Sequence, residues 1–242
     1  MRRAGSTLVL AGALLCAATT VGAQQTFFGV DPNGSSANST SARNAFLAFL
    51  TGGVGTETFE GLGVGTTNPA LTFPGAGTAS LTGGGTVIDD PCCGRRAISG
   101  SNLYETRSAA DGGTTFVINF SDPVAAFGFL GTDIGDFGSQ LTLRFFLAGG
   151  GSVDWGLPYD AGESGEGDLM YAGYINTATF TSVAFIGTES EDVFGFDDMT
   201  VGSLGQVNPN PSVVPEPATV VLLGSGLVGV MGVAYRRRRL ED

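Results

Sequence analysis

The sequence contains no histidine and no lysine, so its 11 basic residues are all arginine. Without histidine there is no Ser-His-Asp triad, no histidine-ligated zinc and no histidine general base. The sequence also lacks a Walker A loop, and its Gly-rich stretches lack the context of a nucleotide-binding or nucleophile-elbow motif. These absences predict a protein that is not an enzyme.

One catalytic alternative needs no histidine: a pair of carboxylates that hydrolyses a glycosidic bond. Two acidic stretches contain such residues, namely Glu163, Glu166 and Asp168 in the first, and Glu189, Glu191 and Asp192 in the second. Both stretches are rich in small polar residues, where acids usually face solvent. A carbohydrate-active hydrolase is therefore the alternative function and not the leading one.

Positive charge is scarce, because 23 acidic residues against 11 basic ones leave a net charge of −12 at pH 7. Such a surface repels phosphate backbones, which excludes nucleic acid as a partner. It suits cation binding, or simple solubility outside the cell.

Cysteine is also scarce, with 3 in the chain. The two in the central region, Cys92 and Cys93, are neighbours and lack the second pair or the histidines of a metal site. They can form a vicinal disulfide, pair with another chain or stay reduced. An oxidising compartment favours the vicinal disulfide.

The first 23 residues have the layout of a secretory signal peptide. Arg2 and Arg3 precede the apolar run 8–18, and the small residues 21–23 precede a cleavage site ahead of Gln24. The N-terminus therefore predicts export by the secretion machinery.

The C-terminal region contains an apolar run, 218–235, that carries no charge. As a helix it would reach about 27 Å, close to the ~30 Å hydrocarbon core of a bilayer. The run is followed by Arg236, Arg237, Arg238 and Arg239, and positive charge next to a span stays cytoplasmic. We expect a transmembrane helix at 218–235, with the four arginines as its membrane stop and 236–242 as a basic cytoplasmic tail.

Pro215, Glu216 and Pro217 end a proline-rich linker, 207–217, directly before this run. The Pro-Glu-Pro motif, the apolar span and the arginine cluster together resemble the PEP-CTERM sorting signal of Gram-negative bacteria. The resemblance covers about the last twenty-eight residues. It implies that an exosortase cuts near Pro-Glu-Pro, and that the apolar helix anchors the chain in the inner membrane until then. The released domain would reach the cell surface or the extracellular matrix of an exopolysaccharide producer.

Residues 24–206 are expected to form one exported domain. A polar lead-in, 24–40, precedes a short helix at Thr40–Leu50, capped by a hydroxyl among residues 39–41. Alternating runs then predict strands at 56–60, 114–120, 124–130, 140–148, 169–175, 177–186 and 193–201. Ser121-Asp122-Pro123 predicts a hairpin turn between two of them. The fold class is all-β: an antiparallel β-sandwich, jelly-roll-like, with one N-terminal helix.

Three acids from opposite ends of the domain's sequence form one candidate metal site. Glu60 follows Phe59 early in the domain, and Asp197 and Asp198 follow Phe196 at its end. The first and last strands of a jelly roll are commonly neighbours, and carboxylate oxygens suit calcium. The FE…DD pairing is similar to that of MAM domains and some carbohydrate-binding modules, which implies a structural Ca²⁺. Alternatively these acids are edge residues, because Asp197 and Asp198 point to opposite faces of a strand.

Four aromatic residues close in sequence, Trp155, Tyr159, Tyr171 and Tyr174, form a candidate ligand face, although packing inside the sandwich is the alternative for at least half of them. The leading function is a non-catalytic surface or matrix protein that binds extracellular polysaccharide. A ligand-free structural matrix protein is the third hypothesis.

Overall fold

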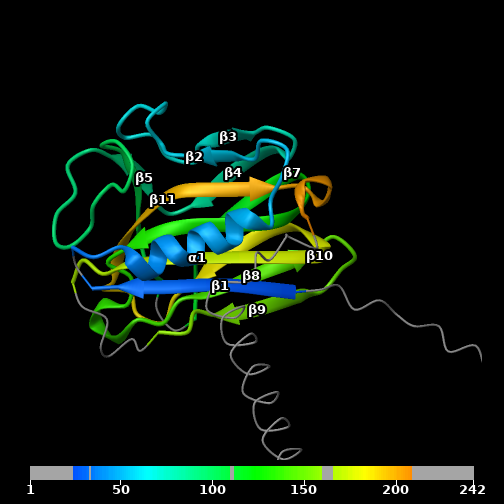
Figure 1. Cartoon of the computed structure of the whole chain (residues 1–242). Helices are drawn as coiled ribbons and strands as arrows, with labels where there is room; N and C mark the ends of the chain where they lie inside the picture. The colour runs from blue at the N-terminus through cyan, green and yellow to red at the C-terminus, as the bar shows by residue number, and fades with distance from the viewer. Residues whose placement is uncertain (1–23, 33, 110–111, 160–165, 209–242) are drawn as a thin grey trace, which may run out of the picture.

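The computed structural model describes residues 24–32, 34–109, 112–159 and 166–208 (Figure 1). Eleven strands and one α-helix make up these ranges. In chain order they are β1 Gln24–Asp31, α1 Ala37–Ala48, β2 Gly55–Glu57, β3 Ala70–Phe73, β4 Gly77–Gly83, β5 Thr86–Ile88, β6 Leu103–Arg107, β7 Thr114–Thr132, β8 Thr142–Leu147, β9 Ser152–Gly156, β10 Leu169–Ile186 and β11 Val193–Gly202. Two 3₁₀ turns, η1 Asp136–Gly138 and η2 Leu204–Gln206, complete the order. The expected mostly-β, antiparallel architecture with one helix is confirmed.

Two long strands, β7 and β10, run antiparallel to each other through both layers of the sandwich. The first half of β7 pairs with β4 and with the second half of β10, which also pairs with β8. The second half of β7 pairs with β11 and with the first half of β10, which also pairs with β1. Each layer is therefore built around one half of the same two-stranded ladder.

The predicted hairpin between 114–120 and 124–130 is wrong, because both runs belong to the single strand β7. Ser121, Asp122 and Pro123 are exposed where β7 passes from one layer to the other. Pro123 has no N–H to donate, and irregular positions of a strand tolerate that loss. Ser121-Asp122-Pro123 does interrupt the pairing of β7 with β10, but the chain bends there and does not reverse.

The predicted polar lead-in at 24–40 is also wrong, because it contains β1 and the start of α1. Phe28 packs toward the sandwich core and Phe27 toward the helix, so both faces of this strand make apolar contacts. The helix N-terminus is capped by Asp31, whose carboxylate accepts the amide N–H groups of Asn38 at 2.9 Å and Ser39 at 2.7 Å. The cap therefore comes from the preceding strand and not from the hydroxyls at 39–41.

Phenylalanine rings from both layers fill the space between them. Phe116 and Phe185 stack at 4.2 Å in one layer, and Phe129 and Phe196 lie 4.9 Å apart in the other. Phe129 and Phe185 join the layers at 5.3 Å, and all four rings are buried. Burying such side chains supplies most of the stabilisation of a domain of this size.

A second, smaller core lies between α1 and the outer face of the layer that contains β1 (Figure 1). Phe46 of the helix contacts Tyr171 of β10 with ring centroids 5.8 Å apart. Gly173 lies directly beneath them, and a Cβ there would come within 2.8 Å of Phe46 and 2.9 Å of Tyr171. The helix therefore packs closely because this strand position has no side chain.

Gly173→Ala is expected to destabilise the protein by about 1–3 kcal/mol, because the added methyl overpacks the contact between helix and sheet. Gly149→Ala is the matched control, since a Cβ at Gly149 meets nothing within 4 Å. Urea unfolding followed by tryptophan fluorescence measures both. Equal midpoints for the two variants would contradict this account of the helix contact.

Within the described ranges, no helix has the length and apolar character needed to cross a bilayer. The predicted signal peptide at 1–23, the transmembrane helix at 218–235 and the tail at 236–242 lie outside the described residues.

Candidate functional site

The loop between β5 and β6, residues 89–102, is fastened to the sandwich by carboxylates. Glu60 accepts the amide N–H of Ser101 at 2.8 Å and of Asn102 at 2.5 Å. These hydrogen bonds favour the ionised form, and they hold the pKa of Glu60 below its ordinary value. The first residue of the predicted calcium site therefore anchors the end of this loop.

Asp197 and Asp198 anchor the middle of the same loop. Asp197 accepts the amide N–H of Ile98 at 2.7 Å and of Ser99 at 3.0 Å. Burial raises the pKa of Asp197 to about 6, against the lowering effect of those hydrogen bonds. Asp198 accepts the hydroxyl of Ser99 at 2.6 Å and pairs with Arg43 at 3.0 Å.

The structure does not gather Glu60, Asp197 and Asp198 into a metal cluster. Each carboxylate already accepts donors from the loop, and Asp198 also neutralises an arginine. No group of three or more acids or cysteines placed to hold a metal occurs in the described part of the chain. The three residues do meet around one loop, as the FE…DD pairing suggested, but calcium binding itself stays a prediction.

Glu60→Gln is expected to lower the melting temperature in EDTA, because an amide oxygen accepts the two loop N–H groups more weakly than a carboxylate does. Differential scanning calorimetry of the full chain measures this effect. A calcium-dependent rise in the wild type that is absent from the variant is what the calcium prediction requires. An unchanged melting temperature in EDTA would contradict the anchoring role.

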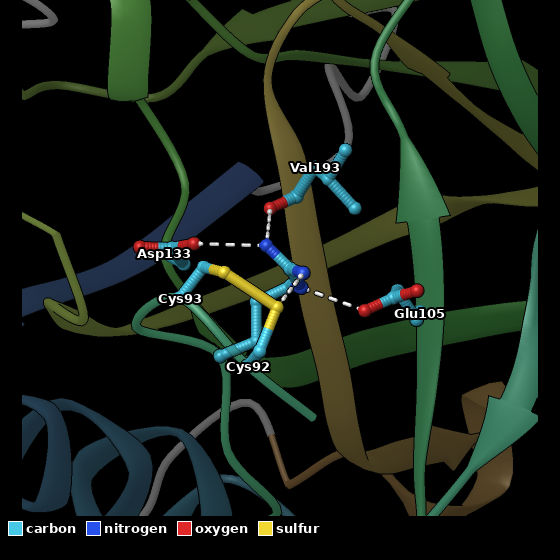
Figure 2. Close-up of a disulfide and its surroundings, with 6 residues drawn as sticks. Cys92, Cys93, Glu105, Asp133 and Val193 are labelled. Carbon is cyan, nitrogen blue, oxygen red and sulfur yellow. Dashed lines mark hydrogen bonds and ion pairs between the residues drawn. A yellow bond between two sulfur atoms is a disulfide. The ribbon is translucent and has the colours of Figure 1, made fainter. Parts of the chain in front are cut away.

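Cys92 and Cys93 form a vicinal disulfide at the start of this loop (Figure 2). Arg95 lies against it, and its Nη2 donates to Cys92 Sγ at 3.3 Å. Glu105 and Asp133 lie on opposite sides of the guanidinium group, at 2.6 Å and 3.4 Å (Figure 2). The carbonyl oxygen of Val193 accepts a further hydrogen bond from it, so the guanidinium is fixed in place.

A hollow of about 310 Å³ opens beside the disulfide. Its wall is formed by the residues Cys93, Arg95, Asp133, Asp136, Phe137, Glu166, Glu191 and Val193. Burial raises the pKa of Asp133 to about 6 and also raises the pKa of Asp136, whose carboxyl is further affected by the negative charge of Glu166. We call this hollow the disulfide pocket; it is strongly negative and contains one fixed guanidinium group.

Phe137, at the edge of the disulfide pocket, exposes 72% of its surface. Its backbone is left-handed, with φ of 57°, a conformation that costs free energy in a non-glycine residue. The turn that carries it, η1, is held from below by Asp192, which accepts the N–H of Gly135 at 3.1 Å. The buried carboxylate of Asp192 therefore supports the turn on which the ring of Phe137 is exposed to solvent.

Asp192 is buried, and this burial raises the pKa of its carboxyl to about 7, against hydrogen bonds from Gly135 and Ser139. The folded protein therefore keeps a proton that the unfolded chain releases. The stabilisation is complete below the ordinary pKa near 3.8 and is lost as the pH rises through about 7.

Asp192→Asn removes this titration, so the variant is expected to gain on the order of 3 kcal/mol over the wild type at pH 8. The gain should shrink toward zero as the pH falls from 8 to about 4. Urea unfolding across this range measures it, with Glu191→Gln, a substitution at the exposed neighbouring residue, as the matched control. A gain that is the same at every pH would contradict the assignment.

The predicted ligand face is wrong for two of its four residues, because Tyr171 and Tyr174 are not on the surface. Tyr171 is buried under α1, and Tyr174 is buried in the core, where it stacks on Phe145 at 3.8 Å. Trp155 and Tyr159 are partly buried against the same core. Strand β10 places Tyr171 and Tyr174 inward, so the packing alternative holds for these two, whereas Trp155 and Tyr159 keep part of their surface exposed.

The remaining predicted residues divide between described and undescribed parts of the chain. Glu166 and Glu191, from the two acidic stretches, meet at the disulfide pocket, whereas Glu163 lies outside the described residues. Pro215, Glu216, Pro217 and the stop residues Arg236, Arg237, Arg238 and Arg239 also lie outside them. Sequence reasoning missed Arg95 and Phe137, although two adjacent arginines in so acidic a domain were a signal.

The C-terminal pattern matches a known family model, described as the PEP-CTERM protein-sorting motif, over residues 213–239. The chain therefore carries this sorting signal, as its sequence predicted. Fold and motif together define the class: an exported β-sandwich protein with a C-terminal sorting signal. No curated protein matches the chain significantly.

Several solved structures match this chain at low identity and with TM-scores below 0.5. The K2 cleaved adhesin domain of Lys-gingipain is 15% identical with a TM-score of 0.38, covering 61% of this chain and 97% of that one. The CBM22-1 xylan-binding domain of Xyn10C from Paenibacillus barcinonensis is 13% identical with a TM-score of 0.38, covering 63% and 96%. TmCBM61 in complex with β-1,4-galactotriose is 15% identical with a TM-score of 0.27, covering 52% and 88%. Likenesses at this level carry no argument about what this chain binds.

Proposed function

We propose that the protein is an exosortase-sorted surface or matrix protein whose sandwich is a non-catalytic binding module for extracellular polysaccharide, with the disulfide pocket as its binding site. An exosortase would process the chain near Pro215, Glu216 and Pro217, as the sorting motif at 213–239 suggests. The observation that carries the binding proposal is the exposed ring of Phe137 at the edge of a polar pocket.

A sugar ring has an apolar face of C–H groups and a rim of hydroxyls. An exposed aromatic ring fits that face, and carboxylates and a guanidinium group fit that rim. The disulfide pocket offers these elements together, since Phe137 stands beside Asp136 and Glu191 and close to Arg95. Arg95 already has its partners within the protein, so it would orient a sugar rather than attract it by charge.

The charge of the protein restricts the kind of polysaccharide. Four carboxylates and one guanidinium group line the disulfide pocket, and the whole chain carries a net charge of −12. Repulsion disfavours polymers rich in uronate, sulfate or phosphate. The favoured class is therefore neutral or amino-bearing polysaccharide.

Phe137→Ala is expected to weaken binding about tenfold or more, because truncating a central aromatic contact typically costs at least 1–2 kcal/mol. The measurement is co-sedimentation of the full chain with insoluble neutral and amino-bearing polysaccharides, each over a range of concentrations. Phe146→Ala is the matched control, because Phe146 is another exposed phenylalanine, 40% exposed, that lies on β8 and not among the residues that line the disulfide pocket.

Loss of binding in the Phe146 variant alone would place the site on the other layer and overturn the assignment to the disulfide pocket. Absence of binding to every neutral and amino-bearing polymer by the folded wild type would overturn the function. Chain-length analysis of the recovered polymer tests the hydrolase alternative at the same time, since a hydrolase shortens its substrate and a binding module does not.

A further inference from the structure

The two sulfur atoms of the Cys92–Cys93 disulfide have different surroundings. Cys92 Sγ accepts a hydrogen bond from Arg95 Nη2 at 3.3 Å. Cys93 instead forms part of the wall of the disulfide pocket, and both cysteines are exposed. The sulfur of Cys92 therefore contacts a positive charge, while Cys93 lines a space that a small molecule can enter.

The guanidinium group of Arg95 is held in this position before any reaction occurs. Its Nε donates to Glu105 at 2.6 Å, and its Nη1 donates to Asp133 and to the carbonyl oxygen of Val193, both at 3.4 Å. Nη2 is the nitrogen that faces Cys92. A donor fixed in this way stabilises a charge that develops on Cys92 without having to reorient.

We propose that this disulfide is a thiol-exchange site at which a small neutral or cationic thiol attacks Cys93 Sγ and Cys92 leaves as the thiolate. A neighbouring cation lowers the pKa of a thiol, and a leaving thiol of lower pKa departs faster. Arg95 thus makes Cys92 the better leaving group. The direction of attack follows from this contact together with the position of Cys93 at the pocket.

The incoming thiol loses its proton to solvent, and its sulfur electron pair forms a new bond to Cys93 Sγ. The electron pair of the Cys92–Cys93 bond leaves on Cys92 Sγ beside Arg95. The incoming thiol is oxidised into a mixed disulfide with Cys93, and Cys92 is reduced; a second molecule of the same thiol can then attack the mixed disulfide and release Cys93.

Charge around the pocket selects among the thiols. The approach to Cys93 passes Asp136, Glu166 and Glu191, whereas Arg95 is already compensated by Glu105 and Asp133. A cationic thiol is therefore attracted and an anionic thiol repelled, most strongly at low ionic strength.

The test uses the full chain and three thiols of similar size: cysteamine as the cation, 2-mercaptoethanol as the neutral compound and 2-mercaptoethanesulfonate as the anion. They are compared at equal thiolate concentration, and freed cysteines are trapped with N-ethylmaleimide. Peptide mapping by mass spectrometry then locates the adduct. We expect the thiol on Cys93, the trap on Cys92, and cysteamine reacting about fivefold faster than the sulfonate at low salt.

Arg95→Gln is expected to slow the reaction about tenfold and to spread the adduct over both cysteines. Arg96→Gln is the matched control, since Arg96 donates to the carbonyl oxygen of Gly167 and not to the disulfide. Circular dichroism verifies that each variant is folded. If Arg95→Gln does not fold, the site of the adduct and the order of the three thiols in the wild type still decide.

Three results would overturn the proposal: an adduct on Cys92 or equally on both cysteines of the wild type, equal rates for the cationic and anionic thiols, or no reaction with any of the three. Unchanged rate and adduct position in a folded Arg95→Gln variant would also overturn it. This test does not depend on polysaccharide binding, so the two proposals fail separately.

Discussion

The antiparallel pairing of β7 with β10 is the constraint on which the rest of the structure depends. Strands of 19 and 18 residues keep this pairing across both layers, with Phe116 opposite Phe185 in one layer and Gly128 opposite Gly173 in the other. Every other described strand is joined to one of these two, directly or through one or two intervening strands. The candidate site lies at one end of the β7–β10 pairing. There Asp133, which follows β7, accepts at 2.7 Å the N–H of Gly167, which precedes β10.

Buried acids in this protein are satisfied mainly by backbone amides. Asp197, Asp133 and Asp192 each accept N–H groups from loops, and salt bridges play a smaller part because positive residues are few. Amide donors stabilise a carboxylate without adding a full positive charge, so burial still raises the pKa of all three. The acidic composition therefore serves the fold as well as the surface, because each of these side chains fixes a loop that carries part of the candidate site.

Local patterns in the sequence predicted the elements whose formation depends on neighbouring residues alone. The alternation of 114–120 and 193–201, the helix near residue 40 and the sorting tail each follow from a short stretch. Continuity of β7 was not predictable, because Ser121-Asp122-Pro123 is as compatible with a bend as with a reversal. The same limit applies to Tyr171, since period-2 alternation does not say which face of a strand a helix covers.

The FE…DD residues illustrate why the site was harder to predict than the fold. Proximity of Glu60 to Asp197 and Asp198 was inferred from topology, and the three do surround one loop. Their partners were not predictable, because the donors from the loop are backbone amides of residues 98–102 and the hydroxyl of Ser99, whose directions depend on the loop conformation. That loop is held at 98–102 by carboxylates and at Arg96 by Thr132 and Gly167, and the N–H of Arg95 donates to the carbonyl oxygen of Cys92 at 3.2 Å. The disulfide and Arg95 therefore stand on a rigid support, which is what a binding or exchange site needs if its geometry is to be set before the ligand arrives.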